Sequence, residues 1–578
     1  MDVLTTRRLG MSALGAVAGL AFYILTKLAE ADSLQGRTLL VIAVATGVFF
    51  TGLLAMFGPL RLMRAALGAA ATAVAVSGLM LLASFRFETV EGLFNSPSAA
   101  LSAAVLALVP LPFWIAAHGA GWRDYPTLFG EAWSIVVRYA AAWAFVGVVW
   151  GVIFLSDALL SIVGMRLVRT ILDIGPVPYL ISGGVLGLGL AVVQELSDYL
   201  SPYLILRLLR LLLPIVLGVT VIFVVALPLR GISGLFGGLS AALTLLAMAG
   251  AAATLVTTAV DQEDAQATDS AILVWAARAM ALLLPVLAGF GAWAVWLRVA
   301  QYGWTPDRVF AAEVAALGLG YGILYALSVL KGTGWMARIR QANIAMALAL
   351  MGLAALSLTP ILDAGRISVT NQMARLEDGR LPVDQLDVAL LGRWGKAGDA
   401  AVKSLTERAT QPGQEALAKR LAMTARDDLN GTSDPAALRA RLRDILPLQP
   451  ATATATRDIY LESLDPFDLQ RLVAACEARL PGGDGPGCVM VVGDLLPLVP
   501  GEEAILASRT PDGYVSYEAF YADSRGVQRR GAISLTGSLP QFDQGADLIR
   551  QWQAQPPALS PAPLNQFPVP RGGVILPP

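Results

Sequence analysis

Histidine and cysteine are almost absent from this sequence, which has one histidine and two cysteines in 578 residues. Zinc centres, haem ligation and histidine-based acid–base catalysis draw on these two residue types. The sequence also lacks a serine elbow, a paired histidine–acid motif and a phosphate-binding loop. We therefore expect no cofactor, no metal site and no catalytic site, and an enzyme is the least favoured class of function.

Charged residues are also scarce, at 15% of the chain, where soluble proteins have about a quarter. The shortage is uneven. The first 363 residues contain 20 Lys+Arg and 18 Asp+Glu, whereas the last 215 contain 22 and 25. This step predicts a domain boundary near Asp363. The formal net charge of −1 leaves no basic surface for nucleic acid, so we expect none as a partner.

Eleven apolar stretches before this boundary are long enough to cross the roughly 30 Å of membrane hydrocarbon as helices. They are Leu9–Thr26, Thr38–Phe57, Ala65–Ser84, Ala100–Ala117, Tyr139–Leu155, Pro178–Val193, Leu211–Pro228, Ile232–Thr257, Ala279–Leu297, Val309–Leu330 and Ala342–Ile361. The predicted fold is an all-α polytopic membrane domain followed by a C-terminal α+β extramembrane domain. The predicted divisions are 1–363, a helical segment 364–450, a small α+β segment 451–555, and a proline-rich tail 556–578.

Arginines indicate how the spans are oriented, because Lys and Arg concentrate on the cytoplasmic side of a membrane. One stands at or near the start of each odd-numbered span; they are Arg8, Arg64, Arg138, Arg210, Arg278 and Arg340. We interpret them as topology anchors rather than as a repeated functional motif. The N-terminus is then cytoplasmic and the C-terminal domain periplasmic, in a bacterial inner membrane. The first span is read as a retained helix, with a cleaved signal peptide as the alternative.

The loop between the ninth and tenth spans carries the densest set of distinctive residues. Thr305 is expected to cap the tenth span, and Tyr302 and Trp304 fit an interfacial aromatic belt. Arg298 and Glu313 stand near the two ends of this loop and are predicted to pair at the outer rim. The loop could also be a docking point, with Arg308 as its last residue.

After Asp363 the sequence predicts soluble structure. Helical periodicity runs from Asp384 to Ala409, with further helices near Gln414–Asp428, Pro435–Ile445 and Asp465–Ala478. The predicted strands, after a linker at Ala451–Thr456, are Asp458–Ser463, Cys488–Val492, Ala504–Ser508 and Tyr514–Tyr521. The last 23 residues contain eight prolines and are expected to be extended or disordered.

The two cysteines are predicted to form a disulfide. Cys476 ends the predicted helix and Cys488 opens a strand, and the turn between them is rich in glycine and proline. In an oxidising compartment this bond would contribute about 3 kcal/mol in the chain-entropy model. The alternative is a pair of buried thiols in a cytoplasmic domain.

Several stretches together resemble a bacterial inner-membrane family catalogued as domain of unknown function 4153 (DUF4153). They are Tyr302–Arg308, Arg366–Val369, Gln372, Arg375–Leu376 and Gly379, together with the multi-span arrangement before them. The resemblance covers the membrane half and the first part of the soluble half. It implies a multi-spanning membrane protein with a C-terminal extramembrane domain, and it brings no activity or catalytic residues.

Two functions remain after these exclusions. The first is non-enzymatic transport or lipid and solute handling, with membrane lipids as partners. The alternative is envelope assembly or sensing through the C-terminal domain, with other envelope proteins as partners. A polar chamber at the middle of the membrane would favour transport, and solid packing of the spans would favour assembly.

Overall fold

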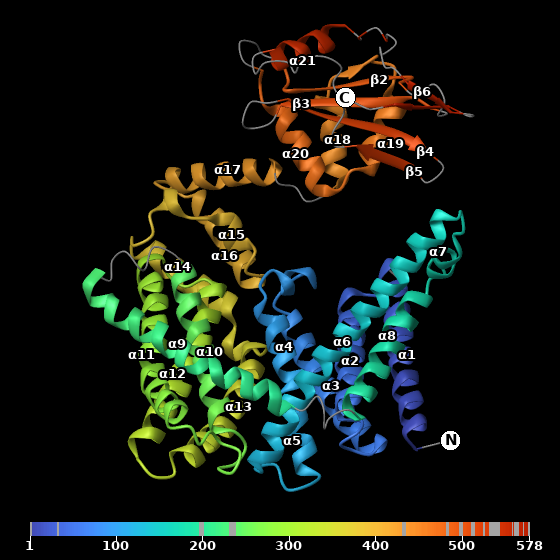
Figure 1. Cartoon of the computed structure of the whole chain (residues 1–578). Coiled ribbons are helices and arrows are strands. Elements are labelled where there is room, and N and C mark those ends of the chain that lie inside the picture. Colours follow the sequence, from blue (N-terminus) through green and yellow to red (C-terminus); the bar gives the residue numbers. More distant parts are fainter. Residues whose placement is uncertain are drawn as a thin grey trace. The chain divides into compact units, whose positions relative to one another are not determined.

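The computed structural model describes residues 3–31, 34–195, 202–230, 239–430, 435–480, 485–495, 501–509, 515–523, 526–530, 544–555, 557, 559, 566–569 and 572–575. The chain divides into two compact units, Met1–Leu417 and Ala418–Pro578. The first unit contains the membrane helices and the second contains a small sheet (Figure 1).

Eleven helices among the described residues are long and apolar enough to cross a membrane, as the sequence predicts. This protein is therefore a polytopic membrane protein. The helices that make up the spans are α1 (Val3–Glu30), α2 (Gly36–Met56), α3 (Leu62–Ser84), α4 (Ser98–Leu108) with α5 (Pro110–Ala117), α6 (Tyr125–Ile162), α8 (Val177–Glu195), α9 (Pro202–Arg230), α10 (Leu239–Val260), α11 (Ala271–Tyr302), α12 (Pro306–Leu330) and α13 (Trp335–Ser357).

Two spans differ in detail from the prediction. The fourth consists of α4 and α5, which divide at Val109 because Pro110 has no N–H to continue the hydrogen-bond ladder. The fifth, α6, has 38 residues, so the expected span Tyr139–Leu155 is only its middle part. Most of the first turns expected for the eighth span, Ile232–Thr257, lie outside the described residues.

The membrane helices form two groups, α1–α8 and α9–α13, which stand side by side in Figure 1. Within the first group, α1 and α8 approach so closely that a Cβ on Gly15 would overlap the carbonyl of Gly183. Gly15 and Gly19 on α1 face Gly183 and Gly187 on α8, and both pairs have the spacing of small residues that lets helix backbones touch in membranes. These glycines are therefore packing sites.

We call the end of the bundle where α1 begins the entry face, and the opposite end, where α13 ends, the exit face. Short elements follow α13 at the exit face and belong to the same compact unit, so the unit ends at Leu417 and not at the composition step near Asp363. These elements are η3 (Pro360–Leu362), α14 (Ala364–Glu377), η4 (Val383–Gln385), α15 (Val388–Gly392) and α16 (Lys396–Ala409). The remaining short elements of the bundle are η1 (Glu91–Phe94) and α7 (Leu167–Leu172).

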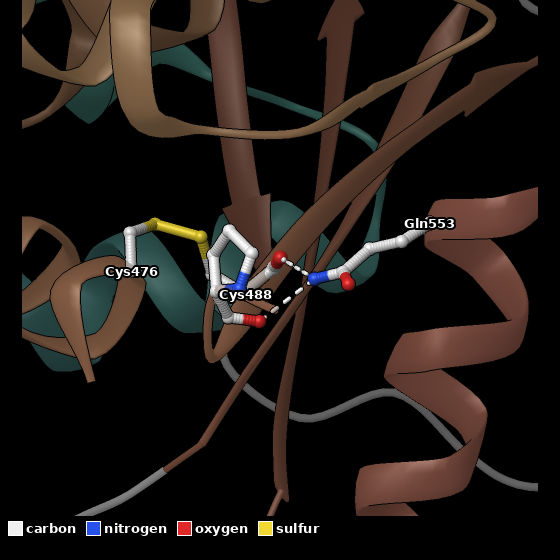
Figure 2. The surroundings of a disulfide bond; sticks show 4 residues. Cys476, Cys488 and Gln553 are labelled. Carbon is white, nitrogen blue, oxygen red and sulfur yellow. Dashed lines mark hydrogen bonds between the residues drawn. A yellow bond between two sulfur atoms is a disulfide. The ribbon is translucent and has the colours of Figure 1, made fainter. Parts of the chain in front are cut away.

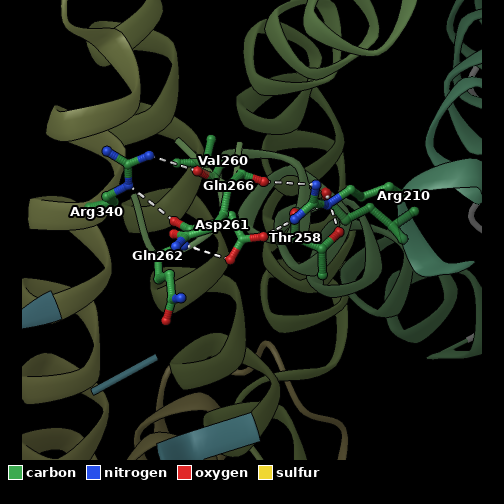
Figure 3. Close-up of polar contacts among 8 residues, drawn as sticks. Arg210, Thr258, Val260, Asp261, Gln262, Gln266 and Arg340 are labelled. Carbon is green, nitrogen blue, oxygen red and sulfur yellow. Dashed lines mark hydrogen bonds and ion pairs between the residues drawn. The ribbon is translucent and has the colours of Figure 1, made fainter. Parts of the chain in front are cut away.

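Arginines close the carboxyl ends of several helices, where the last carbonyl groups have no partner within the helix. At the end of α10, Arg210 donates to the carbonyl oxygen of Thr258 (2.6 Å), and Arg340 donates to those of Val260 (2.7 Å) and Asp261 (3.0 Å) (Figure 3). Arg210 also forms an ion pair with Asp261, and the two side chains are 7% and 3% exposed. Arg138 donates to Ala55 at the end of α2 (3.1 Å). Three of the six arginines interpreted as topology anchors thus also hold helix ends.

The second unit is a five-stranded sheet with helices on both faces (Figure 1). The sheet order is β1-β2-β3-β4-β5; β1 is parallel to β2 and the other neighbours are antiparallel. Its strands and the tail hairpin are β1 (Leu448–Gln449), β2 (Cys488–Gly493), β3 (Glu503–Arg509), β4 (Val515–Asp523), β5 (Gly526–Arg530), β6 (Gln566–Val569) and β7 (Gly572–Ile575). Its helices are α18 (Pro435–Ile445), α19 (Thr454–Ser463), α20 (Pro466–Glu477) and α21 (Gln544–Ala554), and α17 (Glu415–Asn430) leads into it.

The two faces of β2 explain this three-layer arrangement. Met490 and Val492 point into a core with α18, α19 and α20, whereas Val489 packs with Ile549 of α21. Successive side chains of a strand point to opposite faces, so a strand covered on both sides must be apolar throughout. This unit has the mixed helix and strand content that the sequence predicts.

The structure corrects two predictions in the soluble part and agrees with a third. Asp458–Ser463 is not a strand but the second half of α19, which begins at Thr454 within the expected linker. The helical pattern from Asp384 to Ala409 is interrupted at Gly395, whose φ of +76° cannot continue a helix, and α14 precedes it. In the proline-rich tail, β6 and β7 pair as an antiparallel hairpin, so these residues are extended.

Candidate functional site

The loop between α11 and α12 is held from the side by α14. Asn371 Oδ1 accepts a hydrogen bond from the backbone N–H of Trp304 (2.9 Å). Gln372 Nε2 donates to the carbonyl oxygens of Tyr302 (2.9 Å) and Trp304 (3.0 Å). Arg375 donates from its guanidinium to Gln301 (2.6 Å) and Ala300 (3.2 Å). The end of α11 is therefore closed by side chains from an element about 70 residues further along the chain.

Gly303 lies at the centre of this contact. Its φ of +77° and ψ of 179° belong to a region that residues with side chains rarely adopt. A Cβ at this position would lie 2.7 Å from atoms of Asn371, Gln372 and Arg375. Both the backbone conformation and the space thus require glycine here.

The structure also places the predicted residues of this loop. Thr305 caps α12 as expected, accepting from the N–H of Arg308 (3.4 Å). Arg308 donates to the carbonyl of Gly303 (2.7 Å). Tyr302 is 56% exposed and has the guanidinium groups of Arg298 and Arg308 over its ring, at 5.6 and 5.7 Å from the centroid. Trp304 is half-buried against the core that α10, α11 and α12 share.

Arg298 and Glu313 act on different neighbours in the structure, and their pairing stays a prediction. Arg298 lies over Tyr302, while the charge of Glu313 acts on Arg86, which follows the third span. Sequence reasoning missed Arg86 because α3 and α12 are far apart in the chain.

A cavity of about 400 Å³ opens at the exit face between the two helix groups. We call it the exit cavity. Its walls come from the end of α3, η1, the start of α4, the start of α12, the end of α13, and α14 and α15. Its polar and charged lining residues are Arg86, Asn95, Ser96, Ser98, Thr305, Asp307, Ser357, Asp363 and Arg393.

Arg86 connects several of the elements that form the exit cavity. Its guanidinium donates to the carbonyl oxygens of Ser357 (2.9 Å) and Thr359 (2.5 Å), at the end of α13, and lies 3.8 Å from the carboxylate of Asp363. Its own carbonyl accepts from the N–H of Lys396 (2.8 Å), which ties α16 to the end of α3. Burial lowers the pKa of Arg86, and the charges of Asp363 and Glu313 oppose this shift.

Two further charged side chains line the exit cavity. Within the described part of the chain, the side chains of Arg393 and Asp307 form no hydrogen bond or ion pair, and both residues are exposed. Asp363, in contrast, caps α14 by accepting from the N–H of Arg366 (3.1 Å). Within the described residues, the exit cavity thus offers a guanidinium and a carboxylate that take part in no hydrogen bond or ion pair.

A second and larger cavity, of about 650 Å³, lies between the same two helix groups nearer the entry face. We call it the apolar crevice. One wall is formed by α4, α5 and α6, and the other by α10, α12 and α13. Most of its lining is apolar, and the lining residues Leu108 and Val136 are 44% and 58% exposed. The crevice is therefore open to the side, toward the surroundings of the helices.

Three polar side chains that line the apolar crevice, Tyr125, Thr257 and Asn343, belong to one hydrogen-bond network with the buried Tyr325. Asn343 Nδ2 donates to the hydroxyl of Tyr125 (2.8 Å), and Asn343 Oδ1 accepts from Tyr325 (2.5 Å). The hydroxyl of Tyr325 also lies 2.6 Å from that of Thr257. Since these groups already have partners, the crevice offers hydrocarbon contact rather than a polar path.

The cysteine pair lies in the second unit. A disulfide joins Cys476 of α20 to Cys488 of β2 across a Cα–Cα distance of 4.8 Å, as the sequence predicts (Figure 2). Gln553 of α21 donates from Nε2 to the carbonyl oxygens of Cys488 (2.9 Å) and Pro486 (2.7 Å). The start of β2 is thereby fixed to helices on both faces of the sheet.

Comparisons with protein-family models, curated proteins and solved structures found no match to this chain. Among the described residues, no group of three or more His, Cys, Asp or Glu side chains could hold a metal ion. The candidate functional site is therefore the seam between the two helix groups, with the apolar crevice nearer the entry face and the exit cavity at the other end.

Proposed function

We propose that this protein handles lipids in the membrane without catalysing a reaction, and that the apolar crevice holds the hydrocarbon part of the lipid. The observation that carries this proposal is a crevice of about 650 Å³, within the usual size range of small-molecule sites, that opens sideways between spanning helices. A transporter of polar solutes would need polar groups along its path, whereas most of the crevice lining is apolar and Tyr125, Thr257 and Asn343 are held in a hydrogen-bond network.

Between the two cavities the seam is closed by α4 and α13. Leu106 and Ala354 belong to one tightly packed core there, and the hydroxyls of Ser102 and Ser357 are 2.9 Å apart. A lipid in the crevice is thus separated from the exit cavity by the packed contact between α4 and α13. Handling of lipid across the membrane would require α4 and α13 to separate.

The proposal is tested by filling the apolar crevice with a large side chain. Gly250 lines it, and a Cβ there would meet no atom within 4 Å, so Gly250→Trp places an indole in the open space. Gly147 on α6 has equally open space but does not line the crevice, so Gly147→Trp is the matched control. Lipid that co-purifies from native membranes is counted per protein by mass spectrometry. We expect Gly250→Trp to lose most of it and Gly147→Trp to keep it; equal amounts in both variants would refute the proposal.

We also propose that the membrane is a bacterial inner membrane, with the N-terminus in the cytoplasm and the second unit in the periplasm. Supporting this are the arginines near the starts of odd-numbered spans and a disulfide in the second unit. The resemblance to the DUF4153 family is proposed on the same footing. In its support, Asn371, Gln372 and Arg375 hold the Tyr302–Arg308 loop, so the two stretches that carry the resemblance contact each other.

A second candidate function is envelope assembly or sensing through the C-terminal unit, with other envelope proteins as partners. It rests on the separate core and disulfide of that unit. If Gly250→Trp leaves co-purifying lipid unchanged, this candidate gains.

A further inference from the structure

We infer that the exit cavity binds the zwitterionic headgroup of a phospholipid that carries a phosphate and a primary ammonium, which is the headgroup chemistry of phosphatidylethanolamine. This inference rests on the proposed lipid handling and adds the class of lipid. It draws on the charges of the exit cavity, on their availability, and on the place of the cavity at the ends of the spans.

The charge balance of the exit cavity favours a ligand with both signs of charge over a simple ion. Its lining contains two arginines and two aspartates. A plain anion would be repelled by the carboxylates and a plain cation by the guanidinium groups, at close range in a partly enclosed space. A ligand with one charge of each sign satisfies both. Ethanolamine phosphate carries such a pair of charges within a few bonds of each other.

The available hydrogen-bonding groups fit the same ligand. The planar guanidinium of Arg393 has no partner within the described residues and can bind phosphate through two N–H groups. Arg86 Nε is buried and likewise lacks a hydrogen-bond partner there. Asp307 provides a free carboxylate for the three N–H groups of an ammonium. A trimethylated ammonium has no such donors and would satisfy Asp307 less well.

The surroundings of the exit cavity suit a headgroup rather than a free metabolite. The cavity lies where α3 and α13 end and where α4 and α12 begin, which is the level of lipid headgroups for helices that cross the membrane. Leu93, Leu358 and Leu390 also line it, and Leu390 is 40% exposed. These apolar groups would contact the glycerol and the first methylenes of the chains.

A purely structural explanation accounts for only part of this arrangement. Asp307 stands in the first turn of α12, where a carboxylate stabilises the positive end of the helix. Arg393, by itself, would be an ordinary exposed arginine. Neither explanation accounts for the fact that Arg393 and Asp307 both line the same cavity, which α14 and α15 cover on one side.

The experiment measures headgroup selection. The full-length protein is reconstituted in nanodiscs with equal amounts of phosphatidylethanolamine, phosphatidylglycerol and phosphatidylcholine. It is then extracted in mild detergent, and the retained lipids are quantified by mass spectrometry. We expect enrichment of phosphatidylethanolamine, and a fall of roughly two- to tenfold in that enrichment for Arg393→Gln and Asp307→Asn, since each removes a charged contact at a partly exposed site. Glycerophosphoethanolamine should compete with the retained lipid.

The controls are exposed residues of the same type that do not line the exit cavity. Arg366→Gln and Asp384→Asn should keep the enrichment of the wild type. Melting temperatures of all four variants should lie close to that of the wild type, which shows that selection and not folding has changed.

Three results would overturn the inference. They are equal retention of the three lipids, preference for phosphatidylglycerol, which would make this an anion site, and unchanged selection in both Arg393→Gln and Asp307→Asn. If glycerophosphoethanolamine competes at a concentration as low as that of phosphatidylethanolamine itself, the lipid chains add nothing to binding. The site would then be assigned to a free zwitterion instead. In each of these cases total lipid per protein stays above background, whereas failure of the proposed lipid handling itself would remove it.

Discussion

At the scale of residues, the exit face depends on a few positions that other side chains cannot replace. Gly303 combines a positive φ with contact to three side chains of α14, and Arg86 binds α13, Asp363 and α16 at once. Arginine suits such positions because its planar group carries several donors in fixed directions. Arginine therefore both closes the ends of helices and supplies the positive charges of the exit cavity.

The first prediction concerns Gly303. Gly303→Ala should destabilise the protein, by roughly 1–3 kcal/mol from the backbone alone, with a further loss from displacing Arg375 and its neighbours. Gly332 is the control, because its φ of +75° is also positive but no atom lies within 4 Å of its Cβ position. Thermal unfolding in detergent should rank wild type above Gly332→Ala and Gly332→Ala above Gly303→Ala. Equal losses of stability in the two variants would mean that the contact of Gly303 with α14 does not contribute to the stability of the protein.

The second prediction concerns the buried pair of Arg210 and Asp261. Arg210→Met leaves a buried carboxylate alone and should cost about 3–5 kcal/mol. Adding Asp261→Asn should recover part of this loss, as a double-mutant cycle would measure. Lys27→Met removes the partner of Glu30 in an exposed pair and should cost at most about 1 kcal/mol. Additive losses from Arg210→Met and Asp261→Asn would contradict coupling between them.

Much of this residue-scale detail could not be predicted from the sequence. The capping role of Thr305 follows from local spacing, and so does the disulfide of Cys476 and Cys488, because both depend on short stretches of chain. The exit cavity joins Arg86 to Asp363 and Arg393 across about 300 residues. No local pattern contains such a contact; the only hint is an arginine that directly follows an apolar span.

At the scale of elements, the spans were predictable because hydrocarbon demands long apolar helices, and all eleven appear in the described residues. The short soluble elements were harder. α19 covers Asp458–Ser463, where a strand was predicted, because its buried Tyr460 and Leu461 pack against α18 and the sheet. Tertiary packing decides such short segments over local propensity.

The third prediction concerns the contact of α1 with α8. Gly183→Ala should weaken it strongly, since the added Cβ would overlap the backbone of Gly15. Gly184 is one residue further along and its Cβ position lies 3.7 Å from the nearest atom, so Gly184→Ala should be tolerated. Melting temperature and the yield of monodisperse protein in detergent measure both. A similar loss in the two variants would argue against close backbone packing as the reason for these glycines.

At the scale of the whole molecule, the chain consists of a membrane unit with two cavities along the seam between its helix groups and a separate three-layer unit with a disulfide. The composition step near Asp363 marks where the spans end, but the first unit continues to Leu417 because α14 and α16 pack against it. The low share of charged residues marks the part of the chain that spans the membrane. The extent of a compact unit depends instead on the contacts between its elements.

The fourth prediction concerns sidedness. In a variant with both native cysteines changed to serine, Lys403→Cys, after the last span, should react with a membrane-impermeant maleimide in intact cells. Lys331→Cys, at the end of α12, should react only after the cells are permeabilised. The reverse pattern would invert the proposed orientation and remove the main reason to expect an oxidised disulfide.

The fifth prediction concerns the cysteines themselves. Because Cys476 and Cys488 are 3% and 0% exposed, protection in the folded protein would not prove a disulfide. Protein taken from native membranes is therefore denatured first and then treated with a maleimide that adds mass. We expect no label without a reductant and two labels after reduction. Labelling of both thiols in the unreduced, denatured protein would show that the bond does not form in the cell.

The arginines that close helix ends also determine when, during synthesis of the chain, each of these helix ends can gain its partner. A chain is made from its N-terminus, yet α2 is closed by Arg138, 83 residues after Ala55, and α11 by Arg375, about 75 residues after its last carbonyls. The carbonyls at the end of α11 thus have no partner of this kind until α14 has left the ribosome, after all eleven spans are complete. A chain that stops at Leu358 would contain every span and still leave the end of α11 open and Arg86 without Asp363. The membrane unit is completed by residues that lie outside its spans.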